Sequence, residues 1–120
     1  MKIRSLLLAS CLLAPVLAFS NIVGTYKAHG IGQSGPYTST VVIQKQGEIY
    51  SATWNYPDGS YETGTGVRKD GVLSFIFKEG SEDLYGVQQY KIEDQTLKGP
   101  WVFYSGTFKG FEKLKKVEKE

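Results

Sequence analysis

The stretch 97-LKGPWVFYSGTFKGFEKL-114 contains two runs in which a glycine or a large apolar residue occupies most alternate positions, separated by Ser105-Gly106. A period of two is typical of β-strands, because successive side chains point to opposite faces of a sheet. The break between the runs supplies a glycine, which tolerates the positive φ of a tight turn. We therefore expect a β-hairpin, with strands near residues 96–104 and 106–114 and one face of each strand buried.

Glu112 lies on the face of the second strand that also carries Phe108 and Leu114. A buried carboxylate needs a cation, several hydrogen bonds or a proton. Arg68 is one candidate partner, and the hydroxyls of tyrosines predicted to face inward are others. Three roles for Glu112 stay open: a structural acid that fixes the strand register, a polar anchor in a ligand pocket, or a general acid or base.

The same alternation continues through the rest of the chain from Ile22 onward. Runs rich in Val, Ile, Thr, Tyr and Phe are interrupted about every ten residues by turn-forming residues, as in antiparallel β-proteins. The expected strands span residues 23–29, 37–46, 48–56, 60–69, 72–78, 84–92, 96–104 and 106–114. Among the breaks, Lys69-Asp70-Gly71 has the composition of a hairpin turn, and GIGQSGP at 30–36 reads as the longest and loosest connection.

Short turns between consecutive strands predict an up-and-down meander. Closing eight such strands on themselves removes both unpaired edges. The predicted fold class is therefore all-β, a single eight-stranded antiparallel barrel, with a two-sheet sandwich as the competing arrangement. A barrel of this size is either filled by side chains or wide enough for one small ligand.

The N-terminal residues resemble an export signal. Lys2 and Arg4 precede an apolar segment at 5–18, and small residues allow cleavage after Ala18 or Ser20. The expected organisation is a signal peptide at 1–20, a barrel domain at 21–114 and a charged tail at 115–120. We accordingly expect export to the periplasm or beyond, with no transmembrane span in the mature chain.

Cys11 offers an alternative to simple cleavage, because LASC at 8–11 resembles a lipoprotein box. The apolar run LLAPVLAF that follows Cys11 argues against it, since a lipid anchor is normally followed by a polar linker. Cleavage after Ser20 would leave no cysteine, so the barrel would depend on core burial without a disulfide. It would also leave 12 basic residues against 12 acidic ones. A neutral domain is not expected to bind nucleic acid.

Few residues suggest catalysis or metal binding. His29 is the only histidine, and no serine lies in a Gly-x-Ser-x-Gly motif. A zinc site needs several His or Cys ligands, and the stretch 58–66 lacks the acid spacing of a calcium loop. We expect His29 to be a polar residue at a loop edge, and we expect no metal and no cofactor.

Two motifs resemble known barrel families. GTY at 24–26 is similar to the Gly-x-Trp that opens lipocalins, and a meander that begins Gly-x-Tyr is similar to avidin. VQQYKIEDQTLKGPWVFYSGTFKGFEKL at 87–114 resembles the C-terminal part of small exported bacterial barrels. The resemblance implies a calycin-type barrel architecture. It implies no particular ligand, since Tyr26 replaces the lipocalin tryptophan and the biotin-contacting residues of avidin have no counterpart.

These observations favour a small exported binding protein that holds an apolar or aromatic ligand in the barrel interior or mouth. A protein-interaction or adhesion module with a filled barrel is the alternative, acting through its loops and an aromatic rim. A cofactor-free enzyme that uses Glu112 is the third. The interior residues expected to bind a ligand are Tyr26, Tyr50, Trp54, Tyr90, Trp101, Phe108 and Glu112. The tyrosines expected near strand ends or loops are Tyr37, Tyr56, Tyr61, Tyr85 and Tyr104.

Overall fold

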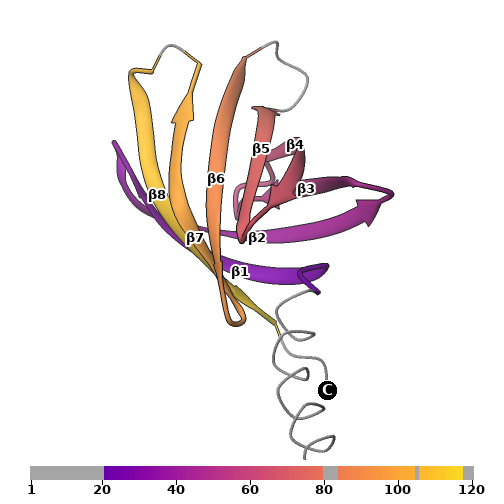
Figure 1. Ribbon diagram of the computed structural model, residues 1–120. Coiled ribbons are helices and arrows are strands. Elements are labelled where there is room, and N and C mark those ends of the chain that lie inside the picture. Colours follow the sequence, from indigo (N-terminus) through magenta and orange to yellow (C-terminus); the bar gives the residue numbers. More distant parts are fainter. Residues whose placement is uncertain (1–20, 80–83, 105, 118–120) are drawn as a thin grey trace, which may run out of the picture.

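The computed structural model describes residues 21–79, 84–104 and 106–117. These residues form a closed barrel in which each strand pairs antiparallel with the next and the last pairs with the first (Figure 1). The eight strands are β1 (Gly24–Gly32), β2 (Gly35–Gln46), β3 (Ile49–Asn55), β4 (Tyr61–Lys69), β5 (Val72–Glu79), β6 (Tyr85–Glu93), β7 (Thr96–Phe103) and β8 (Phe108–Lys116). The predicted all-β meander barrel is confirmed, and the two-sheet sandwich is wrong because β8 closes onto β1.

The turn between β4 and β5 shows how the sequence fixes a hairpin. Asp70 and Gly71 both adopt positive φ, at 52° and 79°. Two consecutive residues with positive φ match the twist of the flanking strands, and an Asp-Gly pair adopts this conformation at little cost. The turn predicted at Lys69-Asp70-Gly71 is therefore present as expected.

The connection between β1 and β2 is shorter than the sequence suggested. The expectation of a long loop at 30–36 is wrong, because β1 continues to Gly32 and β2 begins at Gly35. Gly32 pairs with Gly35, and Gly30 pairs with Tyr37. Gly30 and Gly32 belong to β1, and the absence of side chains on them leaves room for the Tyr37 and Trp101 rings, respectively. At the other end of the chain, β8 also runs two residues beyond the expected boundary at 114.

The two ends of the barrel differ in how they are filled. We call the end with the β2–β3, β4–β5 and β6–β7 turns the closed end, and the end with the β1–β2 and β3–β4 turns the open end. Buried side chains pack the half of the barrel nearer the closed end: Ile22, Tyr26, Ala28, Val41, Ile43, Tyr50, Ala52, Leu73, Phe75, Leu97 and Leu114. Burial of this apolar surface is the main source of stability in a domain of this size.

Tyr26 is buried near the closed end, and its hydroxyl donates a hydrogen bond to the Ile22 carbonyl at 2.7 Å. Burial raises the pKa of Tyr26 to about 12, an effect that the charge of Arg68 partly opposes. Residues 1–20, where the export signal is expected, lie outside the described residues. The described ranges contain no helix long and apolar enough to cross a membrane.

Candidate functional site

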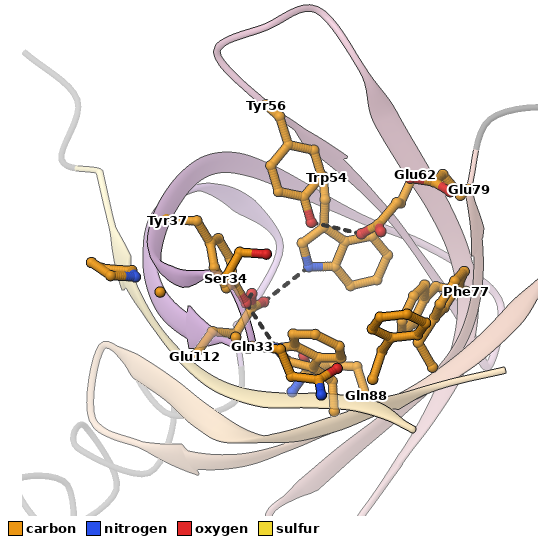
Figure 2. A pocket seen from close by; sticks show the side chains of 16 residues that line it. Gln33, Ser34, Tyr37, Trp54, Tyr56, Glu62, Phe77, Glu79, Gln88 and Glu112 are labelled. Atoms are coloured by element: carbon orange, nitrogen blue, oxygen red, sulfur yellow. Dashed lines mark hydrogen bonds between the residues drawn. The ribbon is translucent and has the colours of Figure 1, made fainter. Parts of the chain in front are cut away.

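A cavity of about 300 Å³ lies at the open end of the barrel. Seven of the sixteen residues that line it are aromatic: Tyr37, Trp54, Tyr56, Phe77, Trp101, Phe103 and Phe108. Three others are acidic: Glu62, Glu79 and Glu112. Figure 2 shows these side chains converging from different strands of the barrel. Aromatic walls with a few polar groups are typical of sites for small ligands.

Glu112 forms part of the cavity floor and is only 2% exposed. Tyr37 donates a hydrogen bond to Glu112 Oε1 at 2.7 Å, and the Trp54 indole donates to Oε2 at 3.1 Å. The hydroxyl of Tyr90 also donates to Oε2, and Trp54 Nε1 lies 2.9 Å from that hydroxyl. Both carboxylate oxygens are therefore held by neutral donors from three strands, which fixes the side chain in one orientation.

Burial dominates the acid–base behaviour of this cluster. Loss of solvation raises the pKa of Glu112, although the hydrogen bonds from Tyr90, Tyr37 and Trp54 oppose the rise. Burial and then the nearby Glu112 charge raise the pKa of both Tyr37 and Tyr90 above the usual value for tyrosine. The two hydroxyls therefore stay protonated at neutral pH and act as donors to the carboxyl group.

Glycines on β1 and β8 let aromatic rings cross neighbouring strands. A Cβ on Gly30 would lie 2.3 Å from Cζ of Tyr37, and a Cβ on Gly110 would lie 2.6 Å from Cζ2 of Trp101. Both contacts are shorter than non-bonded carbon atoms allow. The Trp101 indole, placed in this way, donates a hydrogen bond to the Tyr37 hydroxyl at 2.8 Å. A chain of donors thus runs from Trp101 through Tyr37 to Glu112.

Glu62 and Glu79 occupy another side of the cavity. They are direct partners across the β4–β5 pair, and both line the cavity. Glu62 accepts a hydrogen bond from the Tyr56 hydroxyl at 2.7 Å (Figure 2). Burial raises the pKa of Glu62 to about 7; the Tyr56 bond opposes this rise, while the charges of Glu112 and Glu79 add to it. Near neutral pH, Glu62 therefore exists in both protonation states.

Only some of the interior residues predicted from the sequence lie at the cavity. Trp54, Trp101 and Glu112 line the cavity, and Tyr90 contacts it through its bond to Glu112. Phe108 also lines the cavity, but the expectation that it is buried is wrong: it is 52% exposed, at the first position of β8 beside the open end.

Tyr26 and Tyr50 are buried as expected but lie far along the barrel from the cavity. Each is near the closed end, at the start of its strand, and neither is among the residues lining the cavity. Arg68, expected as a partner of Glu112, lies instead within electrostatic reach of Tyr26. The donors from Tyr37 and Trp54 take the place of the expected cation.

Several lining residues were missed as site residues. Tyr37 and Tyr56 were expected only as rim aromatics, although Tyr37 shares its face with the buried Val41 and Ile43. Glu62 shares the inward face of Gly64, which the alternation could have shown. The remaining tyrosines expected near loops, Tyr61, Tyr85 and Tyr104, are exposed, in agreement with a peripheral position.

His29 lies away from the cavity. It is exposed in the middle of β1, between Thr38 of β2 and Lys113 of β8, so its expected position at a loop edge is wrong. Within the part of the chain that the structure describes, no group of three or more His, Cys, Asp or Glu residues is spaced to hold a metal ion.

Comparison of the chain with models of known protein families finds no match, and no curated protein sequence is significantly similar to it.

Proposed function

We propose that this protein is a small exported binding protein, which holds one small ligand with an apolar or aromatic part in the cavity at the open end. The observation that carries the proposal is a cavity of about 300 Å³ with aromatic walls and a fixed carboxyl group in its floor. This volume is near the lower end of the range of small-molecule sites, which runs from about 300 to 1,000 Å³.

The division of the barrel into two halves supports this proposal. Buried side chains fill the half nearer the closed end, whereas the rings around the open end leave space between them. Hydrogen bonds hold the Trp101, Tyr37 and Trp54 side chains of the walls in their present orientations. A preformed cavity avoids part of the entropy cost of ordering side chains when a ligand binds.

The hydrogen bonds of Glu112 support a positioning role over a catalytic one. Both of its oxygens already accept hydrogen bonds from the protein. A general acid or base must exchange its proton with a substrate, which requires an oxygen directed toward that substrate. We therefore assign Glu112 to the floor that orients the ligand and the surrounding rings.

Export is the second part of the proposal. It rests on the apolar segment at 5–18 after Lys2 and Arg4 and on the small residues before the two possible cleavage sites. The closed eight-stranded barrel agrees with the resemblance to calycin-type proteins, a class that uses such barrels as containers. Mass spectrometry of the protein from its own source would identify the mature N-terminus and any lipid on Cys11.

A protein-interaction role is the second candidate function, and one surface favours it. Ile76, Val87 and Val102 are exposed, and Val87 pairs with both of the others across β5, β6 and β7. They form an apolar row on the outer wall of the barrel. Exposed apolar surface of this kind marks sites where proteins meet when it forms a contiguous patch.

Two measurements test ligand binding. Native mass spectrometry of protein purified from its own source should show additional mass from a bound small molecule. NMR titration with small neutral aromatic compounds should shift the resonances of residues that line the cavity, and Trp101→Ala should weaken the binding at least tenfold. Val102→Ala, which changes the adjacent outward-facing residue, is the matched control and should leave the affinity unchanged. Shifts confined to the outer wall would contradict the proposal and favour the protein-interaction role.

A further inference from the structure

The charges that line the cavity are all of one sign. Glu62, Glu79 and Glu112 contribute three carboxyl groups, and none of the described residues lining the cavity is Lys, Arg or His. The hydrogen bonds to Glu112 and Glu62 come from neutral groups: tyrosine hydroxyls and an indole. Among the residues that the structure describes, no cation therefore lies inside the cavity to balance these acids.

The pairing of Glu62 with Glu79 is unfavourable when both carboxyl groups are ionised. The two residues are direct partners across antiparallel strands, at a separation where like charges destabilise a sheet. Figure 2 shows them together on one side of the cavity, with Tyr37 and Glu112 on the other. A positive group between the two sides would be attracted from both, and would relieve the repulsion between Glu62 and Glu79.

The aromatic walls restrict the kind of cation. Ring faces attract a positive charge within about 6 Å, most strongly at tryptophan, and sites for ammonium groups commonly combine several rings. Here Trp54, Tyr37 and Tyr56 stand beside the acids, and Tyr37 and Tyr56 are in ring contact with centroids 6.2 Å apart. A metal ion such as Ca²⁺ requires six or more oxygen ligands, which apolar ring faces do not supply.

We propose that the cavity selects a compact organic cation, in which an ammonium group lies among the aromatic rings and is neutralised by Glu62, Glu79 and Glu112. This inference rests on the proposed function, because it names the class of ligand for the same cavity. A volume of about 300 Å³ is at the lower end of the range for small-molecule sites, so the part of the ligand that lies inside the cavity is expected to be compact.

The test compares two probes of equal shape. Choline carries a quaternary nitrogen, and dimethylbutanol has a carbon atom in its place and no charge. NMR titration should show choline binding at the cavity at least tenfold more tightly than the alcohol, which corresponds to about 1.4 kcal/mol. Choline, and not the alcohol, should also raise the melting temperature of the protein.

Matched variants test whether the acids that line the cavity cause the preference for choline over the alcohol. Glu62→Gln should weaken choline binding about tenfold and leave the affinity for the alcohol unchanged. Glu48→Gln is the control, because Glu48 is an exposed acid in the β2–β3 turn at the closed end. Thermal melts of each variant separate a loss of binding from a loss of folding.

The outcomes of these titrations distinguish two proposals: that the cavity binds a small ligand, and that it selects an organic cation. Equal affinity for choline and the alcohol would overturn the selection of a cation and leave ligand binding intact. Binding of neutral aromatic compounds without choline would do the same. If choline, the alcohol and the neutral aromatic compounds all fail to shift cavity resonances, the proposed binding function fails as well. Saturable Ca²⁺ binding that is lost in Glu62→Gln would overturn the organic cation in favour of a metal ion.

Discussion

Tyr37 and Glu112 share a hydrogen bond of 2.7 Å although their strands, β2 and β8, are not neighbours in the barrel. β1 lies between them, and its Gly30 pairs with Tyr37 on one side and Glu112 on the other. Adjacent strands are about 4.8 Å apart, so the two side chains together must bridge about twice this distance to form the bond. The Tyr37 ring can cross because Gly30 has no side chain, and the geometry of the cavity floor depends on this absence.

Gly30→Ala tests whether the Tyr37 ring needs the space above Gly30 to reach Glu112. The new Cβ would lie 2.3 Å from the Tyr37 ring, so the ring must move and its bond to Glu112 must break. We expect a loss of about 1–3 kcal/mol in the free energy of unfolding, measured by urea denaturation. In a Tyr37→Ala background the same change should cost much less, because no ring remains above Gly30. An equal cost in both backgrounds would show that the strain arises elsewhere.

Replacing Glu112 tests the hydrogen-bonded floor. Glu112→Leu would leave the Tyr37 and Tyr90 hydroxyls without their acceptor, while the Trp54 indole keeps the Tyr90 hydroxyl as an acceptor. Each orphaned donor costs about 1–3 kcal/mol, so the variant should be destabilised by about 2 kcal/mol or more. Tyr90→Phe should destabilise the wild type more than it destabilises Glu112→Leu, where Tyr90 keeps only its hydrogen bond from Trp54. Additive effects of these two substitutions would contradict the proposed coupling between the residues.

Replacing Ser39 should not lower the stability, in contrast to the substitutions of Gly30 and Glu112. Its hydroxyl is buried on β2 and has no hydrogen-bond partner among the described residues. Ser39→Ala removes a polar group whose burial is unfavourable, so stability should be unchanged or higher by up to about 1 kcal/mol. Calorimetry should show a melting temperature that is equal to or a few degrees above that of the wild type. Ser51→Ala, on the exposed face of β3, is the control. A clear loss of stability in Ser39→Ala would indicate that this hydroxyl has a partner.

The stability of the ligand-free protein should depend on pH through Glu62. Burial raises the pKa of Glu62 from 4.5 to about 7, so the native state keeps a proton that the unfolded chain releases. The stabilisation from this group is complete below pH 4.5 and is lost as the pH rises toward about 7. The raised pKa of Glu112 acts in the same direction.

Thermal melts of the wild type and of Glu62→Gln across this range would measure the contribution. Since glutamine does not titrate, the variant should lose less stability than the wild type as the pH rises from 4.5 to 7. Tyr56, Glu79 and Glu112 face Glu62 and are unchanged in the variant. Parallel curves for the two proteins would contradict the assignment of this pH dependence to Glu62.

The alternation of side chains was enough to predict the eight strands and the inward face of most candidate residues, with Phe108 as an exception. Trp54, Tyr90, Trp101 and Glu112 point inward as expected, because a period of two holds wherever a strand stays in register. The alternation was not enough to predict how far along the barrel axis each inward-facing side chain lies. Tyr50 and Trp54 share one face of β3, yet only Trp54 reaches the cavity, since the two residues are four positions apart.

Local pattern and turn chemistry determined that this chain forms a meander of β-strands with aromatic rings and Glu112 on its inner face. These properties depend on neighbours in the sequence, which the alternation and the turns record directly. Only closure of the barrel decided which acids share a cavity and which donors hold Glu112. Tyr37, Glu62 and Glu112 come from β2, β4 and β8, and strands so far apart in the sequence meet across the interior only once β8 pairs with β1.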